Sequence, residues 1–489
     1  MKNNGKHYIN GIFVDGEGES FVATNPADNS IIWQGANATE AEIKAATDAA
    51  HQALPSWAEL PIETRKKYLK NFSKLIQEKR ENLTKLIALD AGKPLWEAAT
   101  EVNSVIGKID LSIKSYEART NDQKTETANI KSHLSYKPHG VIAVLGPFNF
   151  PAHLSNSHII PALLAGNTIV YKPSELTPLV AQFIMECFDE IKLPKGVLNC
   201  VQGNGKSAQM LLKQDIQGVF FTGSYMTGVK INKFFSDKPE IILALEMGGN
   251  NPLIIDEIKN IKAAIYQTIL STYITAGQRC TCARRLIIPK NKLGEQFLDE
   301  FIKATKNIQV GPYTNKPEPF IGPVISYDHA LSHLNAQAQL IASGGKALVP
   351  MVLQKENTGL LSPGIIDMSD VSTPKDEEIF APLVQVYRYD NFEDAIKLSN
   401  QTKYGLSAGL ISDSYDNYRK FHREVRAGLI NWNRPTTGAA GDLPFGGIGR
   451  SGNHRPSAYF AADYCVYPIA SLEEANLDLP NQILGGIKL

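Results

Sequence analysis

The stretch Val-Ile-Ala-Val-Leu-Gly-Pro-Phe-Asn-Phe-Pro, residues 141–151, joins a continuous apolar run to a loop that contains two prolines. A short apolar run ended by glycine and proline is typical of a strand that is buried on both faces. Four similar runs follow at 168–171, 197–201, 218–221 and 241–245. Helical patterns lie between them at 178–191 and 206–213. Strands that alternate with helices in this way predict a parallel, doubly wound sheet.

A second series of strands is expected farther along the chain, at 252–255, 285–288, 409–411 and 429–432. A chain of 489 residues is also too long for one compact core. We therefore expect an α/β protein with two doubly wound, Rossmann-like domains, the second of which begins at about residue 248.

Two helices are expected ahead of the first sheet. Residues 39–54 open with Thr39 and Glu42, which fit a capping box, and an alanine-rich run follows them. A longer helical pattern covers about 63–90 and ends at a glycine and a proline. The apolar stripes of both helices predict faces that pack on the core.

Composition limits the classes of function. Fifty basic and fifty acidic residues cancel to a net charge of zero with no basic stripe, which argues against a nucleic-acid partner. No apolar run has the form of a signal peptide or the length of a membrane span. Five cysteines, a small and odd number, argue against a secreted disulfide framework, and no metal-binding set accompanies them. We expect a cytoplasmic protein with no membrane association and no metal site.

The segment Thr-Ala-Gly-Gln-Arg-Cys-Thr-Cys at 275–282 contains a candidate nucleophile, Cys280. Glycine and a small residue allow the backbone to approach a neighbour closely, and a thiolate adds readily to an aldehyde carbonyl. A buried structural cysteine is the alternative interpretation of this segment.

Two further candidates directly follow predicted strands. Glu246 lies at the carboxyl end of an apolar strand, where α/β sheets bind their ligands. Partial burial would raise its pKa and suit it to act as a general base, although a capping or salt-bridging glutamate fits the same pattern. Asn149 lies in the loop with two prolines, where its amide can face a developing oxyanion or form an Asx turn.

Two other strand ends suggest a dinucleotide site. In Tyr-Lys-Pro-Ser-Glu at 171–175, Lys172 can donate to ribose hydroxyls or phosphate, and Glu175 can accept from a ribose diol. The segment Phe-Thr-Gly-Ser-Tyr-Met-Thr-Gly at 221–228 lies at a strand-to-helix turn, where the first amides of the helix favour phosphate. Its spacing differs from the usual GxGxxG fingerprint, so the two segments predict a dinucleotide only when they are taken together.

In this order the motifs resemble the aldehyde dehydrogenase superfamily, and the similarity runs over nearly the whole chain. Further matching pieces lie at 378–382, 404–406 and 444–449. Within the superfamily, longer blocks resemble the enzymes of bacterial arginine breakdown that oxidise the 5-semialdehyde of N-succinylglutamate. These blocks are 244–257, 275–285, 452–458 and 461–465.

The resemblance implies the roles of single residues. It makes Cys280 the nucleophile, Glu246 the base and Asn149 the oxyanion donor. It also implies NAD as the cofactor, since the positions of its contacts are occupied by Lys172, Glu175, Gly223, Ser224, Tyr225, Met226, Thr227, Gly228, Glu378 and Phe380. An acidic residue at position 175 disfavours a 2′-phosphate, so we expect NAD rather than NADP.

The implied substrate is a small aldehyde with several carboxylates, which should need cationic anchors. Candidates are Arg279, which adjoins the nucleophile, Arg434, Arg455 and Arg119, and solvated surface or structural pairing is the alternative for each. Rival functions are oxidation of succinate or glutamate semialdehyde, a CoA-acylating reaction that would not require Glu246, and a non-catalytic scaffold with the same fold.

The resemblance also implies how the chain is divided. An NAD-binding domain would comprise 1–125 and 145–247, and a catalytic domain 248–440. A small β oligomerisation arm and the C-terminal tail would comprise 126–144 and 463–489, with a projecting hairpin at 126–139. A homodimer or homotetramer is therefore expected.

Overall fold

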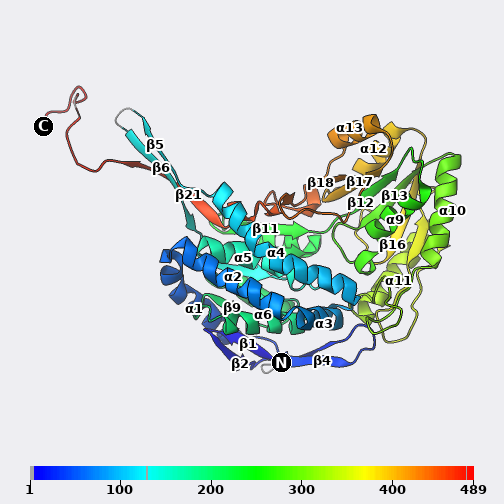
Figure 1. Ribbon diagram of the computed structural model, residues 1–489, viewed down its shortest axis with the longest axis horizontal. Helices are drawn as coiled ribbons and strands as arrows, with labels where there is room; N and C mark the ends of the chain where they lie inside the picture. The colour runs from blue at the N-terminus through cyan, green and yellow to red at the C-terminus, as the bar shows by residue number, and fades with distance from the viewer. Residues whose placement is uncertain (1–4, 128–129, 481) are drawn as a thin grey trace.

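The computed structural model describes residues 5–127, 130–480 and 482–489, and it places two seven-stranded sheets in two lobes (Figure 1). The first sheet has the strand order β11-β10-β7-β8-β9-β1-β2. Its strands are β1 (Lys6–Ile9), β2 (Ile12–Asp15), β7 (Val141–Leu145), β8 (Thr168–Lys172), β9 (Leu198–Cys200), β10 (Gly218–Gly223) and β11 (Ile242–Met247). Strands β7 to β11 are parallel to one another, which confirms the expected sheet. The antiparallel hairpin β1-β2 extends one edge and was not among the predicted strands.

Helices cover both faces of the first sheet and form a separate apolar core on each face. Residues of α2 to α6 build one core, and residues of α1, α7 and α8 contribute mainly to the other. The helices are α1 (Glu40–Glu59), α2 (Ile62–Glu78), α3 (Arg80–Ala91), α4 (Leu95–Arg119), α5 (His153–Ala165), α6 (Pro178–Glu190), α7 (Gly205–Leu212) and α8 (Tyr225–Phe234).

The first helices show where local sequence decides a boundary and where it does not. The expected capping box is present: the Glu42 N–H donates to the Thr39 hydroxyl, and the Thr39 N–H donates to the Glu42 carboxylate at 2.8 Å. The single helix expected over 63–90 is wrong, because the chain forms α2 and α3 instead. They separate at Lys79, whose ψ of 15° lies outside the helical range.

The second lobe contains the second predicted sheet, with the strand order β14-β15-β16-β13-β12-β17-β18. All of its pairings are parallel except β14 with β15. Its strands are β12 (Asn251–Ile255), β13 (Ala283–Pro289), β14 (Lys346–Val349), β15 (Gly364–Asp367), β16 (Leu383–Tyr389), β17 (Ser407–Ile411) and β18 (Leu429–Trp432). The helices of this lobe are α9 (Ile261–Thr272), α10 (Lys292–Lys306), α11 (Tyr327–Ala342), α12 (Phe392–Asn400) and α13 (Tyr415–Glu424).

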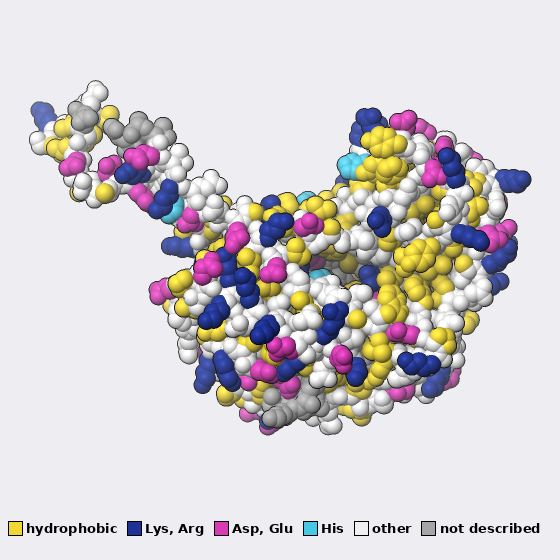
Figure 2. Space-filling model, in the orientation of Figure 1, with side chains coloured by type: hydrophobic (Ala, Val, Ile, Leu, Met, Phe, Trp, Pro, Cys, Tyr) yellow, Lys and Arg dark blue, Asp and Glu magenta, His cyan; other side chains and the backbone are white. Residues whose placement is uncertain are grey.

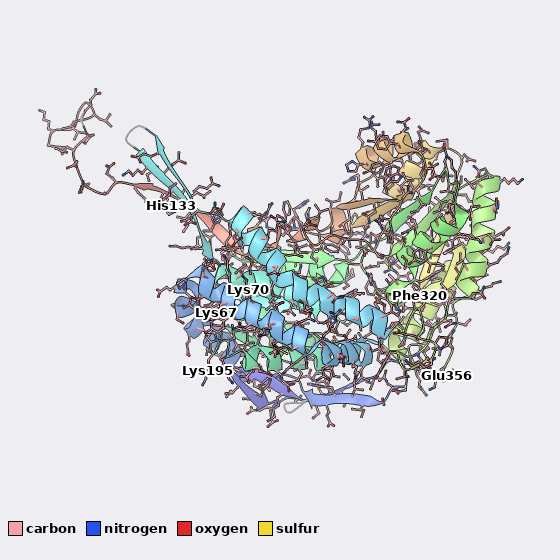
Figure 3. The ribbon with its side chains drawn as sticks, viewed as in Figure 1. Lys67, Lys70, His133, Lys195, Phe320 and Glu356 are labelled. Atoms are coloured by element: carbon pink, nitrogen blue, oxygen red, sulfur yellow. The ribbon has the colours of Figure 1, made fainter. Side chains whose placement is uncertain are left out.

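A three-stranded arm projects from the first lobe (Figures 1 and 3). It consists of β5 (Gln123–Thr127), β6 (Ile130–Pro138) and β21 (Val466–Glu473), in the order β21-β6-β5. The hairpin expected at 126–139 is therefore present, although the residues between its strands lie outside the described part of the chain. Strand β6 ends at Pro138 and β7 belongs to the first sheet, so the predicted arm boundary at residue 144 falls inside β7.

The surface is hollowed between the two lobes, and this hollow is the cleft referred to below (Figure 2). Several shorter elements lie around the cleft and at the edges of the first lobe. These shorter elements are β3 (Ser20–Thr24), β4 (Ile31–Ala36), β19 (Pro444–Phe445), β20 (Ser457–Ala458) and α14 (Ala461–Tyr464). None of the helices in the described ranges is long and apolar enough to cross a bilayer. The carboxyl ends of β10 and β11 in the first sheet carry residues that line the cleft.

Candidate active site

Two cavities meet in the cleft between the sheets, and Cys280 lines both of them. The first cavity has a volume of about 480 Å³ and the second about 420 Å³. Their shared lining residues are Asn149, Leu154, Ser157, Cys280, Phe445 and Ser457. A thiol at this junction can be approached by one ligand from each side, which is the arrangement that a two-substrate reaction requires.

The turn that carries Cys280 is held in an uncommon backbone conformation. Three consecutive residues have left-handed backbones, with φ values of 57° at Thr275, 51° at Ala276 and 72° at Gly277. A Cβ at Gly277 would lie 2.0 Å from the Ala381 carbonyl oxygen, so only glycine fits there. The Asn251 side-chain amide donates to the Cys280 carbonyl oxygen at 2.7 Å. The neighbouring residues therefore fix the position of this turn, which is where strained backbone is often found in enzymes.

Cys280 is partly exposed, whereas Cys187, Cys200, Cys282 and Cys465 are buried. Burial raises the pKa of the Cys280 thiol well above its usual value, and the nearby carboxylates of Glu378 and Glu246 raise it further. The sequence led us to consider a thiolate, whereas the raised pKa favours the neutral thiol. Attack on a carbonyl therefore requires a group that takes the thiol proton.

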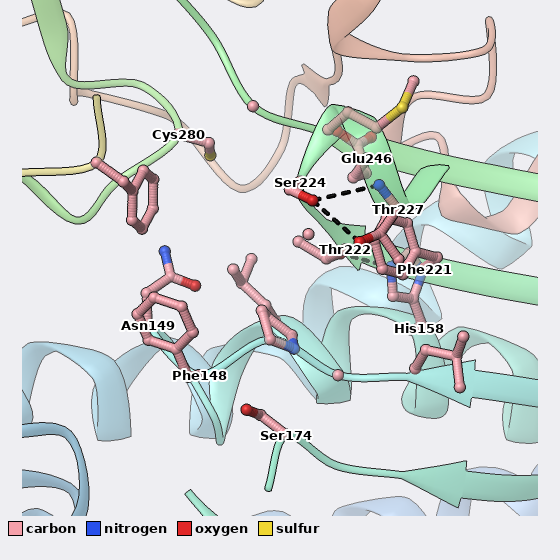
Figure 4. Close-up of a pocket in the computed structure, with 18 of the residues that line it drawn as sticks. Phe148, Asn149, His158, Ser174, Phe221, Thr222, Ser224, Thr227, Glu246 and Cys280 are labelled. Atoms are coloured by element: carbon pink, nitrogen blue, oxygen red, sulfur yellow. Dashed lines mark hydrogen bonds between the residues drawn. The ribbon is translucent and has the colours of Figure 1, made fainter. Parts of the chain in front are cut away.

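Glu246 lies near the end of β11, and its side chain also lines the first cavity (Figure 4). The Ser457 N–H donates to one carboxylate oxygen at 3.2 Å, while the other oxygen has no hydrogen-bond partner among the residues that the structure describes. Burial raises the pKa of this carboxyl to about 8. A carboxylate with such a pKa can accept a proton near neutral pH, as predicted for a general base.

Strand β11, which carries Glu246, is held in place by a segment that is distant in the sequence. The Leu245 N–H donates to the Asn453 side-chain oxygen at 2.9 Å, and the Asn453 amide donates to the Leu243 carbonyl at 2.8 Å. Together with Ser457, this segment fixes the end of β11. It coincides with one of the longer sequence blocks, at 452–458, that suggested a particular subfamily.

Asn149 follows β7 and is buried, and its side-chain N–H donates to the Gln278 carbonyl oxygen at 2.8 Å. An asparagine amide has two N–H donors, so this bond leaves a second donor for another acceptor. Figure 4 shows the amide on the same side of the cavity as Cys280. The arrangement suits the stabilisation of a negative oxygen that forms beside the thiol.

Seven of the ten predicted cofactor residues line the first cavity. They are Lys172, Glu175, Gly223, Ser224, Thr227, Glu378 and Phe380. The other three do not line it: Tyr225 packs beside Tyr404, Met226 is 63% exposed, and Gly228 is buried against Met247. Ser174, Gly205, Ala208 and two histidines of α11 also line this cavity, although the sequence offered no motif for the helical residues.

The polar groups of the first cavity fit a dinucleotide. Lys172 and Glu175 pair at 3.1 Å, which places a donor and an acceptor side by side for ribose hydroxyls. The Ser224 hydroxyl caps α8 by accepting from the Thr227 N–H. One buried oxygen of Glu378 lies 3.7 Å from the Arg284 guanidinium and has no hydrogen-bond partner in the described residues. Burial raises the pKa of this carboxyl to about 7, although the charge of Arg284 opposes the shift. An acceptor that lacks a hydrogen bond is suited to a ligand hydroxyl.

The structure does not bring the four candidate arginines together. Arg279 lines the second cavity, but its guanidinium already pairs with the buried carboxylate of Glu97 at 2.8 Å. Arg119 forms an ion pair with Asp463. Arg434 and Arg455 are exposed and line neither cavity. Arg119, Arg434 and Arg455 line neither cavity, so for these three the structure supports the alternatives, which were structural pairing or a solvated surface.

The residues of α4 that line the second cavity were not among the candidates from the sequence. They are Thr100, Asn103, Ser104, Gly107, Lys108 and Leu111. Their spacing of three and four residues places them on one face of the helix. A mixed polar face of this kind resembles a solvated helix surface in the sequence, so it gave no signal of a site.

Comparison with known proteins agrees with this geometry. The family model described as the aldehyde dehydrogenase family matches residues 13–467. The N-succinylglutamate 5-semialdehyde dehydrogenase of Legionella pneumophila (strain Corby) is 60% identical over 482 residues, which cover 99% of this chain and 97% of that protein. The protein of the same name from Escherichia coli O9:H4 (strain HS) is 48% identical, with 98% of each chain covered.

Among solved structures, this chain is similar to betaine aldehyde dehydrogenase from Staphylococcus aureus in complex with NAD+. The TM-score is 0.92 at 26% sequence identity, and the match covers 98% of this chain and 96% of that chain. The two-lobed arrangement of Figure 1 is therefore shared with a structure that holds the dinucleotide.

Proposed function

Because this chain belongs to the aldehyde dehydrogenase family and is an aldehyde-oxidising oxidoreductase, we propose that it oxidises N-succinyl-L-glutamate 5-semialdehyde to N-succinyl-L-glutamate with NAD, in arginine catabolism. The observation that carries the proposal is the position of Cys280 at the junction of two cavities, in a chain similar over its full length to enzymes of that name. NAD is the proposed cofactor because the Glu378 oxygen that lacks a hydrogen bond and the Lys172–Glu175 pair suit its ribose hydroxyls. The Glu175 carboxylate would repel a 2′-phosphate, which favours NAD over NADP.

The reaction begins with attack of the Cys280 sulfur on the aldehyde carbon. A carbon–sulfur bond forms, the thiol proton leaves to solvent, and the carbonyl oxygen becomes an oxyanion. Glu246 is the proposed base for the later attack of water, since it lines the same cavity and its pKa is raised to about 8. The side-chain amide of Asn149 and the backbone N–H of Cys280 are the proposed donors to the oxyanion.

The adduct on Cys280 then collapses to a thioester. NAD, when bound in the first cavity, supplies the acceptor for the hydride that leaves the former aldehyde carbon. Glu246 next takes a proton from water, the resulting hydroxide attacks the thioester carbon, and the carbon–sulfur bond breaks. Glu246 then returns this proton to the sulfur, so the products are the carboxylic acid, NADH and the regenerated thiol.

The role of Asn149 predicts a specific loss of rate. Replacing it with alanine should lower kcat by about 10²–10³-fold, because one donor to the oxyanion is removed. Asn149→Asp has nearly the same shape but no N–H donor when ionised, so it should show a similar loss. Steady-state NADH production by purified variants measures the effect. An Asn149→Asp protein with the rate of the unmodified enzyme would contradict this role.

The raised pKa of Glu246 predicts a pH dependence. Only the ionised carboxylate can take a proton from water, so thioester hydrolysis should be slow at low pH and level off above about pH 8. Below that value the rate should fall about tenfold for each pH unit, as the ionised fraction does. Rapid-quench measurement of the acyl-enzyme between pH 6 and 9 gives the profile. A rate that does not change between pH 6 and 8 would assign the base to another group.

The substrate is tested by a panel of aldehydes. We expect kcat/KM to be greatest for N-succinylglutamate 5-semialdehyde, with lower values for succinate semialdehyde and glutamate semialdehyde. If either shorter semialdehyde has the greater kcat/KM, the proposed substrate is wrong and one of the rival semialdehyde functions replaces it. Addition of CoA should not accelerate product release, since Glu246 is available to activate water.

We also propose that the chain works as a homodimer or homotetramer in the cytoplasm, with the domains that the sequence suggested except that the first segment of the arm ends at Pro138. The support for assembly is the arm of β5, β6 and β21, which projects away from both lobes and exposes apolar residues beyond its base. Five unpaired cysteines favour a reducing compartment. Sedimentation of the full chain and of a protein that lacks residues 474–489 tests the assembly.

A further inference from the structure

The second cavity contains a buried cation that no carboxylate neutralises. Lys108 lies on the face of α4 that lines this cavity, and the residue is only 4% exposed. Within the described ranges its ammonium has no hydrogen bond and no ion pair. Burial lowers its pKa to about 8, so it still carries its charge for most of the time at neutral pH.

The other cations near this cavity already have partners. The Lys93 ammonium pairs with the Glu101 carboxylate at 2.6 Å, and both residues are buried. The Arg279 guanidinium pairs with Glu97 at 2.8 Å. These four charges cancel in pairs, so Lys108 leaves one positive charge without compensation.

The remaining lining of the second cavity adds no negative charge. It contains no aspartate or glutamate, and beside Lys108 it presents His153 of α5. Burial lowers the pKa of His153, and the charges of Lys108, Lys93 and Arg279 lower it further, so its imidazole is neutral. An unpaired ammonium in such surroundings is unfavourable until an anion reaches it.

We propose that the Lys108 ammonium binds a carboxylate of the substrate and selects anionic semialdehydes over neutral aldehydes, an inference that rests on the proposed function. A carboxylate of the substrate would supply the negative charge that the lining of this cavity lacks. Cys280 lines the same cavity, so a molecule held by Lys108 through one end has its other end in the space that leads to the thiol. Lys108 is thus a specificity-determining residue contributed by the first lobe.

The test compares two lysines of one helix. Lys108→Met removes the charge but keeps an unbranched apolar chain, and Lys114→Met makes the same change at an exposed position of α4. For N-succinylglutamate 5-semialdehyde, kcat/KM should fall by about 10²-fold in Lys108→Met, mainly through KM. For hexanal, which has no carboxylate, it should be unchanged. Lys114→Met should match the unmodified enzyme with both aldehydes, and Lys108→Arg should recover part of the loss.

The possible outcomes separate this inference from the proposed function. An equal loss with both aldehydes would show that Lys108 acts on the structure alone, and an unchanged kcat/KM with both would show that it does not bind substrate. Either result overturns the inference about Lys108. The proposed function is not affected, provided that the unmodified enzyme still prefers N-succinylglutamate 5-semialdehyde. Calorimetry with the product N-succinylglutamate gives a second measurement, in which Lys108→Met should bind about 10²-fold more weakly. Failure of the proposed function is recognised separately, in the unmodified enzyme, by the aldehyde panel.

Discussion

Replacing Cys280 with alanine is expected to lower NADH production by at least about 10⁴-fold, because no covalent adduct can form without the sulfur. The thiol occupies the junction of the two cavities, and the turn that carries it is held by the Asn251 amide. The first cavity should remain intact, so the variant should still bind NAD with the Kd of the unmodified protein. Initial rates and a fluorescence titration with NAD measure the two quantities.

Cys282 provides a matched control for this variant. It lies two residues away, is buried, and lines neither cavity. Cys282→Ala should therefore keep its activity. If Cys280→Ala also turns over at a substantial fraction of the normal rate, the covalent mechanism is wrong. The partial exposure of Cys280 further predicts that a thiol reagent modifies one cysteine for each native chain, and that the aldehyde protects it.

The second large effect is expected from Glu246→Gln, which should form the thioester and then stall. Glutamine keeps the shape of the side chain but cannot take a proton from water, so turnover should fall by about 10²–10⁴-fold. The stalled enzyme should release about one equivalent of NADH for each active site and little afterwards. Rapid mixing followed by intact-protein mass spectrometry measures both the burst and the acylated chain.

A control for this variant lies six residues earlier on the same segment. Glu240 is exposed, so Glu240→Gln should turn over normally. A Glu246→Gln protein that gives no burst would indicate that Glu246 is needed for attack by the thiol as well. A Glu246→Gln protein with the normal steady rate would exclude Glu246 as the base for thioester hydrolysis.

The fold was predictable where a strand is buried on both faces. Such strands are continuous apolar runs, and β7, β8 and β10 begin at the expected residues. The separation of α2 from α3 was not predictable, because the apolar stripe continues across Lys79 and only the backbone departs from helical geometry. Hairpin β1-β2 was missed although the sequence contains a signal for it: Asn10 and Gly11, both with positive φ, join β1 to the apolar run at 12–14.

The candidate site was predictable in part. Cys280, Glu246 and Asn149 each follow a recognisable local segment, and the structure places all three around one cavity. The raised pKa of the thiol was not predictable, because it depends first on burial and then on Glu378, and both arise only after folding. The same holds for partners of charged side chains: nothing in the local sequence indicates that Arg119 pairs with Asp463, 344 residues later.

The segment at 452–458, which holds the strand of Glu246 in place, affects the order in which this protein folds during synthesis. β11 is an edge strand of the first sheet, and its outer side is joined by Gly452 and Asn453, which lies 208 residues after its partner Leu245. While the ribosome is still producing the second lobe, that edge has nothing to pair with and is open to association with other nascent chains. We therefore expect the edge of β11 to stay unpaired, and Glu246 to lack its hydrogen bond from Ser457, until the segment at 452–458 has left the ribosome.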